Sequence, residues 1–419
     1  MGWLEAYEGG GARLTPGSVR VRCIVRAVVS GVYLDYNGSA PLDPRVLEAM
    51  MPALAEGVGN ASSVHGFGRS QAAAVGEARD QVAALVGGRP GGVVFTAGAT
   101  EANNLALQGV VDGEDGSRSR VLVSAVEHAS VLEPARWLAG QGLAKVDLVP
   151  VTPGGFVDPD VLGSMMGPDV LLVSVMAANS ETGVLNAVAE IAERVHAYGG
   201  LFHCDVTQLV GRMGFDLDTV GADLVSLSGH KICGPGGVGA LVGTRRGLRG
   251  LRPLIHGGGH ERGLRSGSIN VGGVVGFGAA ARIAFEERNV EADRVSRLRD
   301  RLVRGLGQHI PDVHQNGDLS RRLPNTTSVR FVGADADAVL VNMEPVAVST
   351  GSACSSGSVE PSGVLLAMGL GRDAAFESIR FSLGRFTTSE DIDVAVQKTV
   401  TAVSYVRRMT QGESVDAAC

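Results

Sequence analysis

The stretch of sequence that decides the fold is SLSGHKICGPGGVG, residues 226–239. It continues an apolar run that begins at Leu224 and passes directly into a glycine-rich loop. A short apolar run bounded by glycines is typical of a buried strand, and the ligand crevices of open α/β sheets lie just beyond the carboxyl ends of their strands. We therefore interpret Lys231 as a residue at the ligand-binding edge of a sheet. The alternative is a surface lysine in an ordinary loop.

Short β-branched runs alternate with Ala-rich helical patterns on both sides of this stretch, from residue 31 to about residue 285. The runs lie at residues 93–95, 121–123, 170–173, 201–203 and 223–225. Such alternation predicts βαβ units and a mostly parallel sheet. The expected fold class is therefore α/β.

The chain after about residue 287 has a different pattern. A charged helix is expected over residues 288–307, and a long helix is expected to open at Ser389. Strand-like runs lie between them at residues 328–331, 346–348 and 379–382. This mixture predicts a smaller α+β domain. The expected organisation is a large domain over residues 41–287, a small domain made of residues 31–40 with 288–419, and an N-terminal extension over residues 1–30.

Composition argues against several classes of protein. The net charge of -7, with no long run of Lys or Arg, gives nucleic acid or an anionic membrane surface little to bind. No apolar stretch reaches the roughly 20 residues that a membrane span needs, and the first 30 residues lack the zones of a signal peptide. The five cysteines form no CxxC pair, so neither a disulfide framework nor a metal site is predicted. We expect a cytoplasmic protein that acts on small molecules.

Lysine is rare in this chain, where Lys145, Lys231 and Lys398 are the only examples. Lys398 falls on the polar face of the last predicted helix and Lys145 precedes a strand-like run, so both are typical of surface groups. Lys231 is left as the candidate for lysine chemistry. A pyridoxal-5′-phosphate (PLP) enzyme needs such a lysine to hold the cofactor, a carboxylate for the pyridine nitrogen and a cradle for the phosphate.

The other two requirements have candidates at the ends of predicted strands. Asp205 ends an apolar run, where its carboxylate would meet the pyridine nitrogen. The turn 95–101 joins a strand to a helix that begins near Thr100, and the backbone N–H groups at a helix start bind phosphate well. Singly, each residue is more often a turn or cap residue. Together with Lys231 they favour a PLP site.

Short motifs follow one another in a fixed order along most of the chain. They are YLDY at 33–36, NASSVH at 60–65, ATE at 99–101, EH at 127–128, NSETG at 179–183, HCDVTQ at 203–208, SGHK at 228–231, HGGGHER at 256–262, RSG at 265–267, SAC at 352–354 and IRFSLGRFT at 379–387. This ordered set, from about Val32 to about Val394, resembles the class V aminotransferase family, and within it the cysteine desulfurases of the IscS/NifS type. The resemblance implies a fold type I PLP-dependent transferase, a homodimer whose active sites lie at the subunit interface.

The resemblance also implies roles for the matching residues. Lys231 would hold the cofactor covalently, and His128 would stack on its ring. We further hypothesise that His128 shuttles the thiol proton of the substrate, because the pKa of histidine lies near the working pH. The other cofactor contacts would be Asp205 at the pyridine nitrogen, Gln208 at the phenolic oxygen, Thr100, Ser228 and His230 at the phosphate with Ser268 of the partner subunit, and Ala99 and Asn179 nearby. Arg380, with Asn179, would bind the substrate carboxylate, because a guanidinium meets a carboxylate through two parallel hydrogen bonds.

Cys354 decides the chemistry within this family. It lies in the run STGSACSSGS, residues 349–358, whose small residues neither pack a core nor favour a helix, so we expect a loop that can move. The resemblance implies that Cys354 takes the sulfur of L-cysteine as a persulfide. Cys204 and Cys233 lie in apolar contexts and are expected to be buried. Cys23 and Cys419 lie near the chain ends.

The implied activity is a PLP-dependent conversion of L-cysteine to L-alanine, with delivery of the sulfur to an acceptor protein such as a scaffold or a thiotransferase. Selenocysteine lyase, another C–S lyase, or a non-catalytic PLP-binding subunit are the alternatives. Iron–sulfur assembly, tRNA or DNA thiolation and natural-product synthesis all remain open as the fate of the sulfur. The chain departs from the family pattern at Gly38-Ser39-Ala40-Pro41, Ser180 and Gly236, and its tail after about Arg408 does not match the scaffold-contacting tail.

Overall fold

The structure is a computed structural model that describes residues 31–351 and 360–411. Cys23, Cys354 and Cys419 therefore lie outside the described residues. No helix within the described ranges is both long and apolar enough to cross a membrane.

A seven-stranded sheet forms the larger part of the fold, with the order β2-β8-β7-β6-β5-β3-β4. Its strands are β2 (Val93–Thr96), β3 (Arg120–Ser124), β4 (Lys145–Val149), β5 (Val170–Ser174), β6 (Leu201–Asp205), β7 (Leu224–Ser228) and β8 (Gly239–Gly243). Of these seven strands, β8 alone runs antiparallel to the other six. The predicted α/β fold with a mostly parallel sheet is confirmed.

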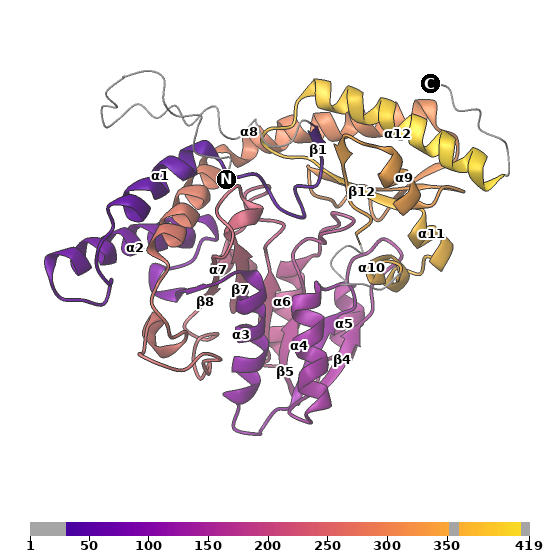
Figure 1. Ribbon diagram of the computed structural model, residues 1–419. Helices are drawn as coiled ribbons and strands as arrows, with labels where there is room; N and C mark the ends of the chain where they lie inside the picture. The colour runs from indigo at the N-terminus through magenta and orange to yellow at the C-terminus, as the bar shows by residue number, and fades with distance from the viewer. Residues whose placement is uncertain (1–30, 352–359, 412–419) are drawn as a thin grey trace, which may run out of the picture. The chain divides into compact units, whose positions relative to one another are not determined.

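Helices cover both faces of this sheet (Figure 1). Successive side chains of a strand point to opposite faces, and β3 shows the consequence: Val121 and Val123 pack with one set of helices, whereas Leu122 packs with the other. The first set is α3 (Ala99–Asp112) and α4 (Ala129–Gly140). The second set is α1 (Pro44–Ala55), α2 (Gly66–Leu85), α5 (Pro159–Met165), α6 (Val188–Ala197), α7 (Leu217–Val220) and the first half of α8 (Val271–His309). The burial of both faces explains why the strands are apolar throughout.

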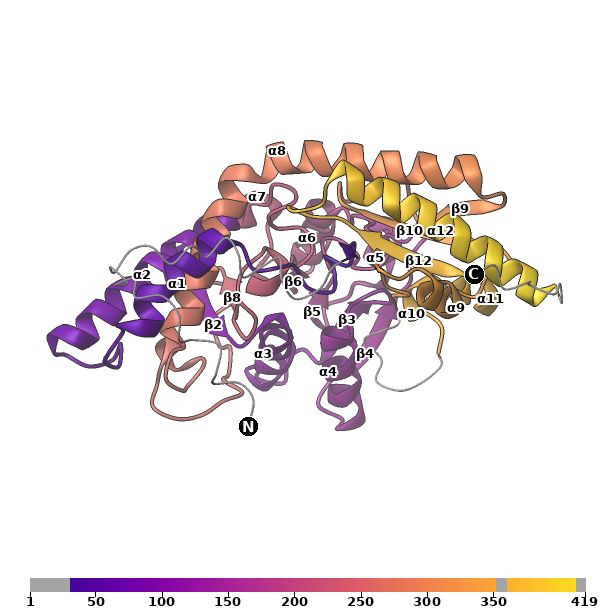
Figure 2. The ribbon, with the colours of Figure 1, turned by 45° about the horizontal axis from the view of Figure 1, so that its top comes forward.

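Helix α8 corrects the sequence analysis, which predicted a helix only over residues 288–307. The helix begins at Val271, where Asn270 caps it by accepting a hydrogen bond from the backbone N–H of Gly273 at 3.1 Å. Its first half is apolar and packs on α1 and α2, and its charged second half runs beside α12 (Figure 2). Because the two halves of α8 have different surroundings, the residue pattern changes half-way along the helix. The sequence pattern therefore did not indicate one continuous helix.

A three-stranded antiparallel sheet, β12-β10-β9, builds the second core. Its strands are β9 (Val313–Asn316), β10 (Thr326–Phe331) and β12 (Ser378–Ser382), and a separate parallel pair joins β1 (Val32–Tyr33) to β11 (Val346–Ala347). The nearby helices are α9 (Ala336–Asn342), α10 (Gly363–Ala367), α11 (Arg372–Phe376) and α12 (Ser389–Thr410). The chain near Leu34 packs in the same core as Leu302, Phe381 and Val403. Strand β9, Val-His-Gln-Asn, was not predicted because it carries no β-branched run.

Candidate active site

Lys231 ends a short 3₁₀ turn, Gly229–Lys231, that follows β7 directly. Its Nζ donates to the backbone oxygens of Asn37 and Gly38 at 2.6 and 2.5 Å. The segment after β1 thus lies against the carboxyl end of β7. Lys231 stands at the edge of the sheet where parallel α/β proteins bind ligands.

Asp205 ends β6, next to β7 in the sheet, and is 7% exposed. Its Oδ1 accepts from the backbone N–H of Thr207 at 2.9 Å, and its Oδ2 accepts from Nδ2 of Asn103 at 2.8 Å. Fixed donors of this kind hold the carboxylate in one orientation. The carboxylate of Asp205, which we predicted to pair with the pyridine nitrogen, therefore has a defined position.

His128 is the N-cap residue of α4, and its Nδ1 accepts from the backbone N–H of Ser130 at 3.1 Å. Burial lowers the pKa of His128; the charge of Asp205 opposes this shift and that of Lys231 adds to it. The imidazole is therefore neutral near pH 7. Because His128 feels the charges of Asp205 and Lys231, the three residues gather at one place.

The predicted phosphate turn lies between β2 and α3. Helix α3 begins at Ala99 after Gly98, an N-cap that has no side chain to satisfy the first N–H groups, and Thr100 is exposed on this first turn. Glu101 folds back to accept from the backbone N–H of Ala97 at 2.7 Å. A Cβ added at Gly239 would lie 2.6 Å from the carbonyl carbon of Gly98, so this glycine allows β8 to approach the turn closely.

Ser228 and His230 lie on the same side as this turn. A Cβ at Gly98 would be 3.9 Å from Oγ of Ser228, and that oxygen lies 2.9 Å from Nδ1 of His230. Burial, followed by the charge of Lys231, lowers the pKa of His230 to about 4, so its imidazole is neutral at physiological pH. A neutral imidazole is a hydrogen-bond partner for an anion without a second positive charge beside Lys231.

Ser268 is exposed, and an ion pair links the loop that carries it to the start of α3. Nε of Arg265 donates to Oε1 of Glu101 at 2.8 Å, in a pair whose two side chains are largely buried. The loop that carries Ser268 therefore lies near the phosphate turn of its own chain.

Gln208 follows Asp205 by three residues and is buried. Its Nε2 donates to the backbone oxygen of Asn37 at 3.1 Å, the same oxygen that accepts from Lys231. Its Oε1 is buried and has no hydrogen-bond partner in the described parts of the chain. An unpaired buried acceptor is costly, and a ligand that donates to it would remove that cost.

Arg380 lies in the middle of β12 and is 7% exposed. Its Nη2 donates to Oδ1 of Asp35 at 2.6 Å and its Nη1 to the backbone oxygen of Ser180 at 3.1 Å. Its Nε is a buried donor without a partner among residues 31–351 and 360–411. Arg380 thus already holds one carboxylate, and Nε remains as a nitrogen donor without a partner in the described chain.

Asn179 folds the turn 179–183 with its own side chain. Its Oδ1 accepts from the backbone N–H groups of Glu181 and Thr182, both at 2.9 Å, and its Nδ2 donates to the backbone oxygen of Val126 at 3.1 Å. Nδ2 also lies 3.7 Å from Sδ of Met176, so the structure gives Asn179 a clear structural task.

Glu181 lies close to described residues on both sides of the segment 352–359. Oγ of Ser362 donates to Oε2 of Glu181 at 2.5 Å, and a Cβ added at Gly351 would meet the same oxygen at 2.5 Å. Burial raises the pKa of Glu181, against the opposing effects of Ser362 and the charge of Arg380. The described residues on both sides of Cys354 therefore lie near Arg380.

Cys204 and Cys233 are both buried, as predicted. Burial raises the pKa of Cys204 well above its ordinary value and that of Cys233 to about 12. Both thiols stay protonated at neutral pH and are poor nucleophiles.

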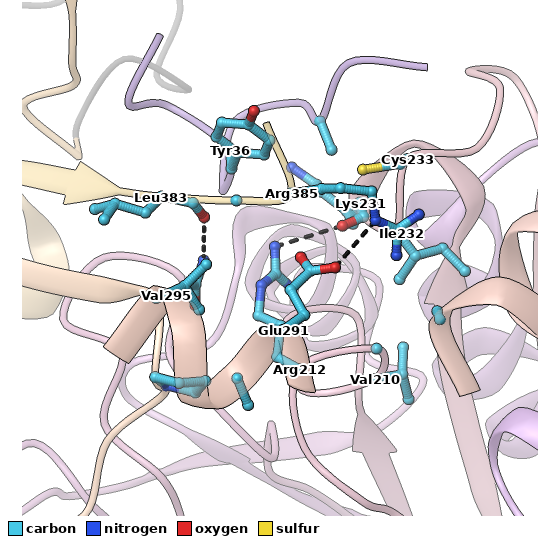
Figure 3. A pocket seen from close by; sticks show the side chains of 17 residues that line it. Tyr36, Val210, Arg212, Lys231, Ile232, Cys233, Glu291, Val295, Leu383 and Arg385 are labelled. Atoms are coloured by element: carbon cyan, nitrogen blue, oxygen red, sulfur yellow. Dashed lines mark hydrogen bonds and ion pairs between the residues drawn. The ribbon is translucent and has the colours of Figure 1, made fainter. Parts of the chain in front are cut away.

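A cavity lies behind Lys231, lined by the 231–233 segment, α8 and the chain after β12. Figure 3 shows Arg212, Glu291 and Arg385 converging beside Lys231. Of the predicted cofactor residues, Lys231 alone contributes to this cavity, so it is distinct from the edge that holds Asp205 and His128. In the described ranges, no group of three His, Cys, Asp or Glu side chains is placed to hold a metal ion.

The family model described as Aminotransferase class-V matches residues 32–394. The chain belongs to the class V aminotransferase family. Cysteine desulfurase IscS of Anaeromyxobacter sp. (strain Fw109-5) is 44% identical to this class V aminotransferase over 380 residues, which cover 90% of this chain and 94% of the relative. Cysteine desulfurase of Frankia sp. (strain EuIK1) is 45% identical over 395 residues, 92% of this chain and 94% of the relative. A solved NifS-like protein superposes with a TM-score of 0.84 at 36% identity, covering 90% of this chain and 100% of its own.

Class V aminotransferases are generally PLP-dependent enzymes, and three features of this chain fit that cofactor. The first turn of α3 offers N–H groups that no side chain caps, as a phosphate requires. Gln208 leaves a buried Oε1 unpaired beside the lysine. Asp205, an acceptor fixed by two donors, lies next to the strand that leads to Lys231. The family and fold class predicted from the motifs are confirmed.

The site also contains several residues to which the sequence patterns assigned no role. They are Asp35, Asn37, Asn103, Ser130 and Glu181. Asp35 and Glu181 belong to motifs that were recognised, YLDY and NSETG, but had no assigned role. Asn103 follows Thr100 by one helical turn and therefore lies on the same face of α3, a spacing that could have singled it out.

Proposed function

We propose that this chain is a PLP-dependent cysteine desulfurase that converts L-cysteine to L-alanine and transfers the sulfur to Cys354 as a persulfide. The observation that carries the proposal is the gathering of Lys231, Asp205 and His128 at one edge of the sheet in a chain similar over 90% of its length to a protein named cysteine desulfurase. Gln208, Ala99, Thr100, Ser228 and His230 would complete the cofactor site, with Asn179 nearby.

The cofactor, when bound, draws electrons from the α-carbon of the substrate. Lys231 would hold it and then move the α-proton of cysteine with Nζ, which the backbone oxygens of Asn37 and Gly38 orient. Asp205 would hold the proton of the pyridine nitrogen. The neutral imidazole of His128 would lie over the ring and turn Nε2 toward the reacting atoms.

Arg380 would bind the substrate carboxylate through Nε, its nitrogen without a partner, and through Nη2, which now donates to Asp35. A carboxylate and a guanidinium form a charge-assisted pair of high directionality. This contact would orient the sulfur end of the substrate toward Glu181 and the chain on either side of Cys354.

Sulfur transfer in this proposal needs no external oxidant. The thiolate of Cys354 attacks the substrate sulfur, an S–S bond forms, the C–S bond breaks, and the electron pair remains on carbon, which is protonated to give alanine. Cys204 and Cys233 do not compete, because their buried thiols remain protonated. The proposal includes a homodimer in the cytoplasm, with Ser268 of the partner subunit at the phosphate, and an acceptor protein that takes the sulfur. It also includes a large domain over 41–287 and a small domain over 31–40 with 288–419.

Mass spectrometry after one turnover without reductant tests the proposal. About 32 Da, one sulfur atom, is expected on the peptide that contains Cys354. Cys354→Ser should form neither persulfide nor alanine, whereas Cys204→Ser should retain both products. Sulfide release by Cys354→Ser at the wild-type rate would instead identify a C–S lyase.

A further inference from the structure

A continuous chain of hydrogen bonds joins His128 to Asp205. Asn103, on α3 and fully buried, donates through Nδ2 to Oδ2 of Asp205 and to Oγ of Ser130, both at 2.8 Å. Oγ of Ser130 lies 2.8 Å from Nδ1 of His128. The side chain predicted to stack on the cofactor ring and the carboxylate predicted to pair with its nitrogen are therefore linked through two residues of the protein.

The Asp205 end of this chain fixes the direction of its hydrogen bonds. An ionised carboxylate only accepts, so the amide of Asn103 must present its NH₂ group to Asp205. The opposite orientation would place Oδ1 of Asn103 against a carboxylate oxygen. In the orientation that remains, Oδ1 is buried and unpaired within the described chain. Leaving Oδ1 of Asn103 unpaired costs free energy, and the two hydrogen bonds donated by Nδ2 outweigh that cost.

The His128 end fixes the same direction independently. The backbone nitrogen of Ser130 can only donate, and it lies 3.1 Å from Nδ1 of His128. Nδ1 must therefore carry a lone pair, and the ring proton must lie on Nε2. The hydroxyl of Ser130 accepts from Asn103 and donates to Nδ1 of His128, so no two donors face each other between His128 and Asp205.

We propose that Asn103 and Ser130 are positioning residues that hold His128 as its neutral Nε2–H tautomer, so that Nε2 is a hydrogen-bond donor to the reacting atoms. The imidazolium and the Nδ1–H tautomer would each place a donor on Nδ1 against the backbone N–H of Ser130. Burial and the charge of Lys231 favour the neutral ring further. The role of this donor in catalysis rests on the proposed function; the tautomer itself does not.

This assignment changes the task of His128. The shuttling of a thiol proton, which we expected from the pKa of histidine, begins with a lone pair on Nε2. The Nε2–H tautomer offers a proton there instead. His128 therefore orients or stabilises an electron-rich group, such as the substrate sulfur, instead of taking the thiol proton.

Nitrogen NMR of the holoenzyme labelled with ¹⁵N-histidine reads the tautomer directly, with His128→Gln to assign the signals. The expected wild-type result near pH 7 is a protonated Nε2 and an unprotonated Nδ1. A proton on Nδ1 of the wild-type protein would overturn the proposal, whatever the desulfurase activity. Alanine formation is measured separately, so a correct tautomer in a protein that makes no alanine would refute the proposed function alone.

Ser130→Ala leaves Nδ1 with one longer donor, so a second tautomer should appear in the spectrum. We expect kcat to fall at least about tenfold, because a catalytic histidine that loses its orienting partner loses activity steeply. Ser130→Thr restores the hydroxyl and should recover both the single tautomer and most of kcat. An unchanged spectrum in Ser130→Ala, or no recovery in Ser130→Thr, would show that Ser130 does not set the tautomer.

Ser174→Ala is the matched control. Oγ of Ser174 lies 2.8 Å from Nδ1 of His203, the same distance as in the Ser130–His128 pair, and both serines are buried. Its loss should change the signals of His203 and leave those of His128 in place. Equal changes at His128 in both variants would reveal a general loss of structure instead of a specific contact.

Discussion

The two sides of Lys231 contain buried polar groups of opposite kinds. On the side of Asp205, several buried atoms have no partner within the described ranges, among them Oε1 of Gln208, Oδ1 of Asn103 and Nε of Arg380. On the other side, beside the cavity of Figure 3, Arg385 forms ion pairs with two carboxylates. Arg385 contacts Asp43 at 2.7 Å and Glu291 at 3.0 Å.

This difference separates a candidate site from a structural network. Unpaired buried polar groups cost free energy unless a ligand or water satisfies them, so they mark the side where chemistry is expected. The paired charges join the start of α1, α8 and the chain after β12, three segments far apart in sequence. Variants on the first side should change the reaction, and variants on the second should change stability.

The largest effect is expected from Lys231→Ala. Without an amine to hold the cofactor covalently, the protein should lose the visible absorbance of bound PLP and all alanine formation. Absorbance spectra before and after borohydride reduction provide the measurement. Lys145→Ala, on the exposed start of β4, is the control and should keep both properties. A reducible adduct that persists in Lys231→Ala would move the cofactor to another lysine.

Arg380→Ala should raise KM for cysteine about 10- to 100-fold, because a hydrogen bond to a charged group is worth about 1.5–3 kcal/mol. Its partner Asp35 loses its ion pair in the same variant, so Asp35→Asn serves to separate the two effects. Steady-state kinetics and the cofactor spectrum are measured together. Loss of the cofactor with unchanged KM would place Arg380 at the phosphate instead of the substrate.

Arg385→Gln should lower the free energy of unfolding by about 3 kcal/mol, since it leaves buried carboxylates with one partner fewer. Asp43 retains Arg45 at 2.8 Å, which limits the loss. Urea unfolding gives the measurement, and the KM for cysteine should stay near its wild-type value. Arg282→Gln removes an exposed pair on α8, the helix that carries Glu291, and should cost no more than about 1 kcal/mol. A large change in KM with little change in stability would show that this side belongs to the active site.

The smallest effect is expected in the contribution of Asp43 to the stability of the protein at low pH. Burial opposes ionisation, but hydrogen bonds from Arg45 and Arg385 lower the pKa of Asp43 to about 2. The folded pKa lies below the unfolded value of about 3.9, so the stabilisation is complete above that pH and is lost as the pH falls toward 2. The urea midpoint of the wild type should therefore fall more steeply over this window than that of Asp43→Asn. Parallel curves for the two proteins would contradict the assignment.

Local patterns in the sequence predicted the strands of the large sheet and the fold class. These predictions succeeded because a strand buried on both faces shows a short run of apolar residues, and because the carboxyl ends of parallel strands meet at one edge of the sheet. The scarcity of lysine then singled out Lys231, and the ordered motifs identified the family. None of these steps needed to know which segments meet.

Only the tertiary structure decided which side chains touch. Asn103 meets Ser130 across 27 positions and Asp205 across 102, and Asp35 meets Arg380 across 345. Such contacts depend on helix placement and strand register, which local periodicity does not encode. The same reason explains the continuity of α8, whose two halves pack against different cores, and the tautomer of His128, which is set by a hydrogen-bond chain from three separate elements.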